Sequence, residues 1–267
     1  MPAEENPKAA SRIERARIAT GDEFAALLHD GNADVIQATL DNPQLDESHL
    51  CTILDRLELP AAILEAIGAH PFWLRSEAVK VRMARHPRTP PRISLALVRQ
   101  IYLFDLVGLS LAPSTPAEVR RLSEETIIGK VPQLPLGQKI TLARRAPGRV
   151  AAALLAEGHP QVNKVALNNP HLNESQILKV LAKPGLKGQV VAAIAQHSKW
   201  SCEYNVRLAL LRNPQTPYPT ALSFLQHVTP KDLRDLETLQ TLPASLRKHV
   251  HDELRRRACA GEARPAV

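Results

Sequence analysis

The chain has 267 residues, and 34 Lys and Arg against 27 Asp and Glu give it a formal net charge of +7. Apolar residues make up 44% of the sequence, enough for a packed core, whereas only 11 glycines disfavour glycine-rich phosphate loops and all-β folds. Cys51, Cys202 and Cys259 are odd in number and far apart, which argues against a disulfide framework or a zinc site. We therefore expect a cytoplasmic protein without a metal or a cofactor.

Residues 1–20 are charged and lack the apolar stretch of a signal peptide. We expect a mobile N-terminal arm, with the arm proper at residues 1–11, that leads into the start of the first helix. The longest apolar runs, such as residues 190–195, are too short to span a bilayer. The sequence predicts no membrane segment.

An internal duplication organises the rest of the chain. Residues 34–121 align without a gap on residues 161–248, and roughly 25 of the 88 pairs are identical. The matched positions that mark the repeat are Asn42, Pro43, Trp73 and Pro87 in the first copy and Asn169, Pro170, Trp200 and Pro214 in the second. We interpret residues 21–121 as repeat module 1, 122–160 as degenerate linking repeats, 161–257 as repeat module 2 and 258–267 as a disordered tail.

The pattern within each module predicts helices. In stretches such as residues 176–181 and 206–211 the apolar side chains recur at helical spacing, and strand alternation is nowhere sustained. Asp46 and Asn173 stand at expected N-cap positions. Further helix starts are marked by threonine as the N-cap with proline after it, at Thr89, Thr115, Thr216 and Thr229, and the run from Thr115 to Glu118 also has the pattern of a capping box. Short helices of this kind bury an apolar face only by stacking on neighbours, which is typical of a solenoid.

The phrase that repeats is an apolar helix, then Asn or His followed by Pro, then a second apolar helix, best matched at residues 79–95 and 206–222. It resembles the leucine-rich repeat variant, a short α-solenoid repeat related to HEAT repeats. The resemblance implies an all-α, right-handed α-solenoid. Some members of that family carry an N-terminal cysteine cluster for an iron–sulfur centre, and this sequence has no such cluster.

Three kinds of position could belong to a site. The Asn-Pro and His-Pro turns, with Asn42, Asn169, Asn213 and His86, could form a polar ladder, although the side chains are better explained as partners of free carbonyls at helix C-termini. Trp73 and Trp200, each three residues after a histidine, could be stacking platforms, and the competing interpretation is a core residue whose indole N–H bonds a turn carbonyl. Asp105 and Asp232 could be acids, but an Asp near a helix start also stabilises the helix dipole.

The basic residues are the strongest candidates for partner binding. Matched positions carry charge in both modules: Lys80 pairs with Arg207, and Arg85 pairs with Arg212. The predicted partner-binding residues are Lys80, Arg82, Arg85, Arg88, Arg144, Arg145, Arg149, Arg207 and Arg212. If they share a concave face, they form a positive groove for an acidic peptide or for phosphates. The competing interpretation is an ordinary solvated helix face.

Enzyme signatures are absent from the sequence: it contains no phosphate loop, dinucleotide fingerprint, zinc-protease motif or nucleophile elbow. His249 and His251 are metal-ligand types, but two residues apart they point to different sides of a helix. We predict no catalytic residue and no metal ligand.

The function predicted from these features is a non-enzymatic α-helical scaffold that binds another protein, through an acidic segment, on a basic concave surface. One alternative is a nucleic-acid-binding HEAT-like protein. It extends to an enzyme similar to the alkylpurine DNA glycosylases, whose fold, basic face, tryptophans and catalytic Asp are compatible with Trp73, Trp200, Asp105 and Asp232. The other alternative is a structural module of a larger bacterial assembly. The oligomeric state is left open.

Overall fold

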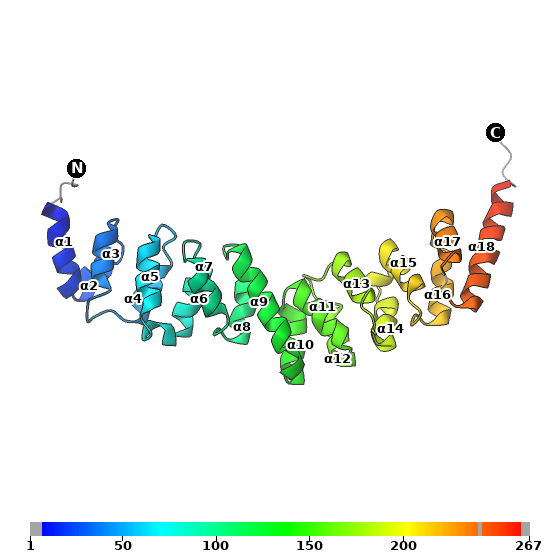
Figure 1. The fold of residues 1–267 in the computed structure, drawn as a ribbon, viewed down its shortest axis with the longest axis horizontal. Coiled ribbons are helices and arrows are strands. Elements are labelled where there is room, and N and C mark those ends of the chain that lie inside the picture. Colours follow the sequence, from blue (N-terminus) through cyan, green and yellow to red (C-terminus); the bar gives the residue numbers. More distant parts are fainter. Residues whose placement is uncertain (1–6, 240–241, 263–267) are drawn as a thin grey trace. The chain divides into compact units, whose positions relative to one another are not determined.

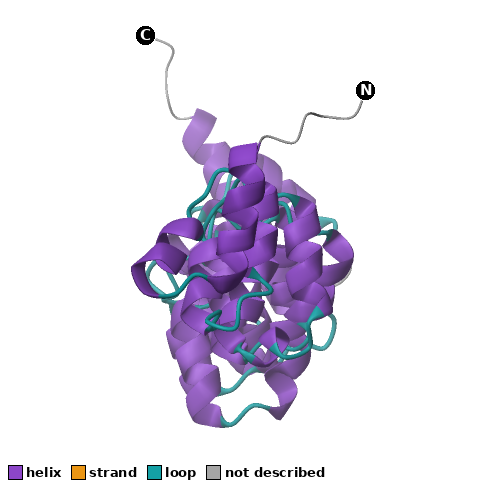
Figure 2. Cartoon of the chain, turned by 90° about the vertical axis from the view of Figure 1, so that its left-hand side faces the viewer, coloured by secondary structure: helices purple, strands orange, loops and turns teal. Residues whose placement is uncertain are grey.

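The structure, a computed structural model, describes residues 7–239 and 242–262. These residues form 18 α-helices and three short 3-10 helices joined by loops, and they contain no β-strand (Figure 2). The all-α fold class predicted from the sequence is confirmed at this level. The chain divides into two compact units, unit 1 up to Gly129 and unit 2 from Lys130. This division falls within residues 122–160, the segment that the sequence predicts to link two modules.

Unit 1 contains nine α-helices and one 3-10 helix (Figure 1). They are α1 (Pro7–Ile18), α2 (Gly21–Leu27), α3 (Ala33–Thr39), α4 (Glu47–Leu54), α5 (Ala61–Ala69), η1 (Trp73–Arg75), α6 (Glu77–Arg85), α7 (Pro91–Val98), α8 (Leu103–Leu111) and α9 (Ala117–Lys130). Helices two apart in the chain pack side by side: α1 lies against α3 and α3 against α5, while α4 lies against α6 and α6 against α8. The unit therefore has two rows of helices.

Unit 2 has the same kind of arrangement. Its elements are η2 (Val131–Gln133), α10 (Leu136–Arg145), α11 (Gly148–Glu157), α12 (Pro160–Ala166), α13 (Glu174–Leu181), α14 (Gly188–Gln196), η3 (Trp200–Cys202), α15 (Tyr204–Arg212), α16 (Tyr218–Leu225), α17 (Pro230–Glu237) and α18 (Ala244–Glu262). One row is α10, α12 and α14, and the other is α11, α13, α15 and α17. Helices α3 to α7 begin and end 127 residues before α12 to α16.

The ends of the described chain are helical. Helix α1 begins at Pro7, within the segment for which the sequence predicts an arm, and residues 1–6 lie outside the described part. Helix α18 continues to Glu262, so it covers the first half of the predicted tail, and residues 263–267 lie outside the described part. Helix α1 thus begins before residue 21 and α18 ends after residue 257, outside the boundaries that the sequence predicts for the two modules.

Two N-caps predicted from the sequence are confirmed. Asp46 accepts a hydrogen bond from the backbone N–H of His49 at 2.9 Å, and the His49 ring reaches back to the Asp46 N–H at 3.4 Å. Asn173 does the same with Gln176, at 3.0 Å in each direction. These reciprocal bonds satisfy donors that a helix start otherwise leaves open.

For three of the four threonines predicted as N-caps, the helix begins one residue later than the sequence predicts. Only Thr229 is an N-cap, and its hydroxyl accepts from the Asp232 N–H at 3.2 Å. Helices α7 and α16 instead have Pro90 and Pro217 at the N-cap, where the ring holds φ at −54° and −57°. The corresponding threonine hydroxyls turn inward: that of Thr216 donates to the Leu210 carbonyl at 2.5 Å. Thr115 is likewise buried ahead of α9, which begins at Ala117, and does not form the expected capping box.

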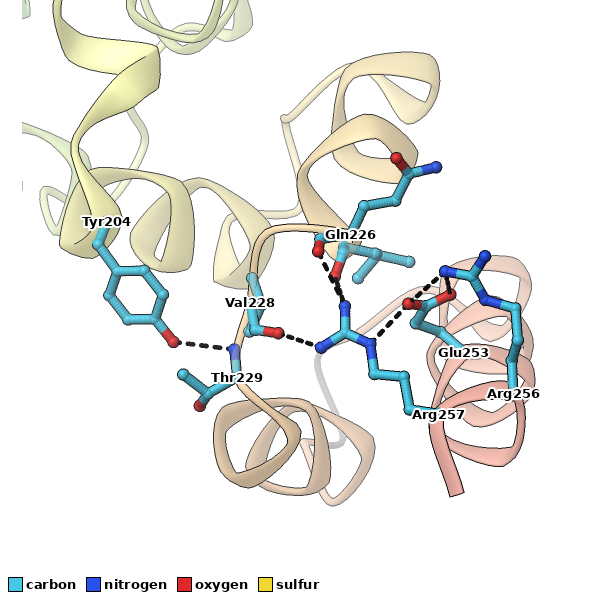
Figure 3. A network of polar contacts seen from close by, with 8 residues as sticks. Tyr204, Gln226, Val228, Thr229, Glu253, Arg256 and Arg257 are labelled. Atoms are coloured by element: carbon cyan, nitrogen blue, oxygen red, sulfur yellow. Dashed lines mark hydrogen bonds and ion pairs between the residues drawn. The ribbon is translucent and has the colours of Figure 1, made fainter. Parts of the chain in front are cut away.

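Arg257 connects α18, the last helix of unit 2, to the C-terminal end of α16. Its guanidinium donates to the carbonyls of Leu225 and Gln226 at 3.0 Å each and to that of Val228 at 2.5 Å (Figure 3). Glu253, one turn earlier on α18, accepts from Arg257 Nε at 2.7 Å. The arginine thereby caps the C-terminal carbonyls of α16 with a charge of the favourable sign.

Arg257→Met is therefore expected to lower the free energy of unfolding of unit 2 by about 1.5–3 kcal/mol, the usual worth of hydrogen bonds to a charged group. Urea unfolding followed by circular dichroism measures the change. Arg256→Met is the control, because the Arg256 side chain is 67% exposed and, among the described residues, bonds only Glu253, so its loss should cost under about 1 kcal/mol. Equal effects of the two substitutions would contradict the capping role.

Candidate functional site

The asparagines of the Asn-Pro turns are structural partners of earlier helices. Asn42 Nδ2 donates to the carbonyls of Ala16 and Ala19, at 2.8 and 3.0 Å, and the side chain is 4% exposed. Asn169 Nδ2 donates to the carbonyls of Ala143 and Ala146, at 2.9 Å each, and is 2% exposed. The interpretation as partners of helix C-termini holds for both, and the carbonyls belong to the helix more than 20 residues earlier.

His86 and Asn213 occupy the equivalent turns after α6 and α15. The Arg88 N–H donates to His86 Nδ1 at 3.1 Å, so Nε2 carries the proton and donates to the Arg56 carbonyl at 2.9 Å. Asn213 Nδ2 donates to the Leu181 carbonyl at the longer distance of 3.3 Å. His86 and Asn213 thus bond carbonyls at or just after the C-terminal ends of α4 and α13. Their polar groups are used within the chain rather than free to contact a partner.

The two tryptophans differ in burial. Trp200 is 1% exposed, and its indole N–H donates to the Leu167 carbonyl at 2.9 Å, as expected for a core residue. Trp73 is half-buried and packs edge-on against Phe72, with ring centroids 4.9 Å apart. Phe72 itself is 59% exposed. An aromatic surface therefore exists in unit 1 at Phe72 and Trp73, whereas Trp200 is internal.

Asp105 and Asp232 both lie in the first turn of a helix, α8 and α17. The hydroxyl of Thr229 donates to Asp232 Oδ2 at 2.6 Å, and the hydroxyl of Tyr204 donates to the same atom. These two bonds, that of Thr229 first, hold the pKa of Asp232 below its usual value. A carboxylate stabilised as the anion suits a helix N-terminus and is a poor general acid.

The basic candidates of unit 1 all have internal partners. Lys80 is 8% exposed and forms an ion pair of 2.5 Å with Glu77. Arg82 Nε lies 3.1 Å from Asp55 Oδ1. Arg85 Nε donates to Ser114 Oγ, and Arg88 donates to the Glu58 carbonyl, at 2.7 Å each. Lys80 is therefore an internal residue of the packing, and the other three are exposed or half-exposed charges with one neighbour each.

The basic candidates of unit 2 are less engaged. Arg207 is half-buried and donates to the Ser201 carbonyl at 2.5 Å, and Arg149 is exposed in the first turn of α11. Arg144 and Arg145, in the last turn of α10, and Arg212, in the last turn of α15, are exposed. Across the described residues, these last three arginines form no hydrogen bond or ion pair with the protein.

A cavity of about 660 Å³ lies beside Arg212. Its lining comes from the C-terminal half of α13, residues 182–186 of the loop after it, and one side of α15 from Asn205 to Arg212 with the turn after it. Leu178, Leu181 and Leu208 supply an apolar wall, and Lys183 and Arg212 supply two cations. The volume is in the range of about 300–1,000 Å³ that ligand pockets have. Sequence reasoning singled out Arg212 but missed Lys183 and the cavity.

A second cavity, of about 590 Å³, lies between α12 and α14 and is lined by polar side chains that include His197. His197 Nδ1 is buried and has no hydrogen-bond partner within the described residues. Burial, and then the charge of Lys199, lowers the pKa of His197 from its usual value of 6.5. The folded chain therefore favours the neutral ring.

Acid is expected to destabilise unit 2 through this histidine. Because its pKa is lower in the folded state than in the unfolded one, its contribution is fully present above about pH 6.5 and is lost as the pH falls towards the lowered value. Urea unfolding at pH 7 and pH 5 measures the loss, which His197→Gln should reduce. Lys199→Met should reduce it by less, since Lys199 is the smaller cause. An unchanged loss in His197→Gln would exclude this histidine as the source.

Comparisons with family models, with curated proteins and with solved structures found no match to the chain. Over residues 7–239 and 242–262, no three His, Cys, Asp or Glu side chains are grouped so that they could hold a metal ion. No helix in the described part of the chain is long and apolar enough to cross a membrane. What supports a function is therefore the chemistry of the chain's own side chains.

Proposed function

We propose that the protein is a right-handed α-solenoid of the HEAT-like, leucine-rich-repeat-variant type, built from two tandem copies of one module. Matched helix boundaries and matched contacts support this proposal. The bonds of Asn42 to two alanine carbonyls are reproduced 127 residues later by Asn169. The ion pair of Arg12 with Asp30, at 2.7 Å, has a counterpart in Lys139 and Glu157, at 2.9 Å.

The matched contacts also extend the proposed module. Arg12 lies on α1 and Lys139 on α10, so α1 and α2 correspond to α10 and α11. In this proposal each copy begins before residue 21, and helices α10 and α11 open the second copy rather than link the two. Short helices that each contact the helix two positions along the chain are the packing expected of a solenoid.

The function that we propose for this scaffold is to bind an acidic segment of another protein, without catalysis. The observation that carries the proposal is the pair of exposed cations, Arg212 and Lys183, at the edge of the apolar cavity. Neither forms a hydrogen bond or an ion pair among the described residues, and the charge of Arg212 reaches Asp232 only at a distance, where it helps to lower the pKa of that carboxyl. Exposed cations of this kind attract an anionic partner, and an apolar wall beside them favours a polypeptide over a bare phosphate backbone. Arg144 and Arg145, in the last turn of α10, are two further exposed cations of unit 2.

Nucleic acid fits these features less well. Single-stranded nucleic acids are held by stacking on exposed aromatic side chains, and the chain has few: 2 Trp, 3 Tyr and 4 Phe. Three of the four basic candidates of unit 1 pair with a neighbouring carboxylate or carbonyl. Protein binding therefore leads the proposal, and nucleic acid is the outcome that the test below would reveal.

The test is fluorescence anisotropy of the full chain with a labelled glutamate-rich peptide, single-stranded DNA, duplex DNA and RNA, at low and moderate salt. We expect the acidic peptide to bind, and Arg212→Glu to weaken that binding at least roughly tenfold. Arg85→Glu should weaken it by less, because Arg85 is not among the residues that line the cavity and its guanidinium already bonds Ser114. Arg99→Glu is the control with the same change of net charge, at an exposed position of unit 1.

Unchanged peptide binding in both Arg85→Glu and Arg212→Glu would overturn the proposal. Preferential binding of DNA or RNA that collapses on adding salt would replace it with nucleic-acid recognition, because released counterions produce such a dependence. A glycosylase assay would then be the next experiment.

A further inference from the structure

The cavity between α13 and α15 has an apolar interior. Leu181 is buried, and Leu178, Leu186 and Leu208 are half-buried around it. Half-buried leucines that face a cavity leave apolar surface in water, and a ligand that covers such surface is stabilised by the hydrophobic effect. The interior therefore favours an apolar side chain.

The rim of the cavity is positively charged. Lys183 lies on the loop after α13 and Arg212 at the end of α15, both exposed and both without a hydrogen bond or ion pair among the described residues. No Asp or Glu is among the residues that line the cavity. Glu174, at the start of α13, accepts a hydrogen bond from Asn205 at 2.9 Å instead of pairing with either cation. An occupant with carboxylates next to its apolar group matches this rim.

Other cations of unit 2 show what happens when an internal partner is present. Lys187 Nζ donates to the Glu157 carbonyl at 2.8 Å, and Lys139 pairs with the Glu157 carboxylate at 2.9 Å. Lys183 and Arg212 form no such bond among the described residues, and Arg212 acts on Asp232 only through its charge. Their donor groups are therefore available to a partner from outside the chain.

The corresponding place in unit 1 is filled. Helices α4 and α6 match α13 and α15 residue for residue, and Ala182 and Ala209 of unit 2 correspond to Asp55 and Arg82 of unit 1. Asp55 and Arg82 form an ion pair of 3.1 Å between the two helices. Two alanines therefore stand in unit 2 where unit 1 has a paired Asp and Arg, and the difference leaves room between α13 and α15.

We propose that this cavity is an anchor pocket, which takes one large apolar side chain of an acidic peptide while Arg212 and Lys183 bind carboxylates beside that side chain. The proposal rests on the function proposed above and adds to it the location and the sequence preference. It assigns the pocket to unit 2 alone. The preferred ligand is a segment with a Leu or Phe flanked by Asp and Glu.

The test uses short labelled peptides of equal negative charge whose central residue is Leu, Phe or Ser, with the full chain. Burial of the anchor should make the Leu and Phe peptides bind roughly tenfold or more tightly than the Ser peptide. The double variant A182D/A209R introduces the pair found in unit 1 and leaves the net charge unchanged. We expect it to bind all three peptides with the weak affinity of the Ser peptide.

A second variant, Ala209→Leu, fills the cavity without any charge and should have the same effect, and circular dichroism reports whether each variant is folded. Equal affinity of the wild-type chain for the Leu, Phe and Ser peptides would overturn the anchor pocket and leave acidic-peptide binding standing. Full retention of the anchor preference in both filled variants would also overturn it. If no acidic peptide binds, the proposed function fails, and the pocket proposal fails with it.

Discussion

Asn169→Ala is expected to lower the free energy of unfolding of unit 2 by about 2–4 kcal/mol. The alanine removes the amide that donates to two buried carbonyls, those of Ala143 and Ala146, and the oxygen that accepts from the His171 N–H at 2.7 Å. Buried carbonyls without a donor lose the hydrogen bonds that water supplies to them in the unfolded chain. The cost is therefore larger than that of an exposed hydrogen bond.

Asn168→Ala is the matched control for this prediction. Asn168 is the preceding residue and is exposed; its amide donates to the Lys164 carbonyl at 2.8 Å, within its own turn, and its oxygen has one long, exposed contact of 3.4 Å with His197 Nε2. Its replacement should change the free energy of unfolding by less than about 0.5 kcal/mol. Urea midpoints from circular dichroism compare the two variants. Similar midpoints would mean that the Asn169 bonds to the earlier helix contribute little.

Trp200→Ala is expected to cost about 3–5 kcal/mol, the usual range for removing a large buried aromatic side chain. Trp200 is 1% exposed, and its indole bonds the Leu167 carbonyl, so the substitution leaves both a cavity and an unpaired acceptor. Trp73→Ala should cost clearly less, because Trp73 is half-buried at the matched position of unit 1. The two variants compare the cost of the same Trp→Ala substitution at a buried and at a half-buried position.

Phenylalanine at the same two positions separates packing from hydrogen bonding. Trp200→Phe keeps an aromatic ring but loses the indole donor, with an expected cost of about 1–3 kcal/mol. Trp73→Phe should be close to neutral. Urea unfolding by circular dichroism measures all four variants, since tryptophan fluorescence itself changes with the substitutions. A cost at Trp73 equal to that at Trp200 would contradict the difference in burial.

The helices were predictable wherever a local signal decides the structure. The caps at Asp46 and Asn173 follow from residue types within one turn. The threonine caps failed because a Thr-Pro pair leaves two choices for the N-cap, and packing decides between them. At Thr89 and Thr216 the hydroxyl is directed to the interior, and the following proline takes the cap.

Helices α1 and α10 show why the sequence alone did not extend the proposed repeat to them. Arg12 and Asp30 correspond to Lys139 and Glu157, so the ion pair is present in both units although neither residue is identical. An alignment scored by identical residues does not detect an ion pair whose residues are similar in charge but not identical. The contact becomes visible only when the folded chain brings together residues 18 positions apart.

The candidate site was predicted in part. The basic positions at the end of α15 were found, because charge recurs at Arg85 and Arg212. Which cations are engaged could not be known, since the partner of Arg82 is Asp55, on another helix 27 residues earlier. The cavity depends on the absence of such a pair at Ala182 and Ala209. A comparison of the two aligned modules for lost charges, rather than for shared ones, would have located it.

In each unit, the side chain before the recurring proline bonds a carbonyl of an earlier part of the chain. Asn42 and Asn169 reach carbonyls 23 and 26 residues earlier, His86 reaches one 30 residues earlier, and Asn213 one 32 residues earlier. On the ribosome, each helix therefore emerges before the turn that satisfies its last carbonyls, and that turn follows within seconds at ordinary rates of synthesis. Each of these bonds joins a newly made turn to a part of the chain that has already been synthesised. Each helix pair can therefore become stable during translation without waiting for a distant part of the chain.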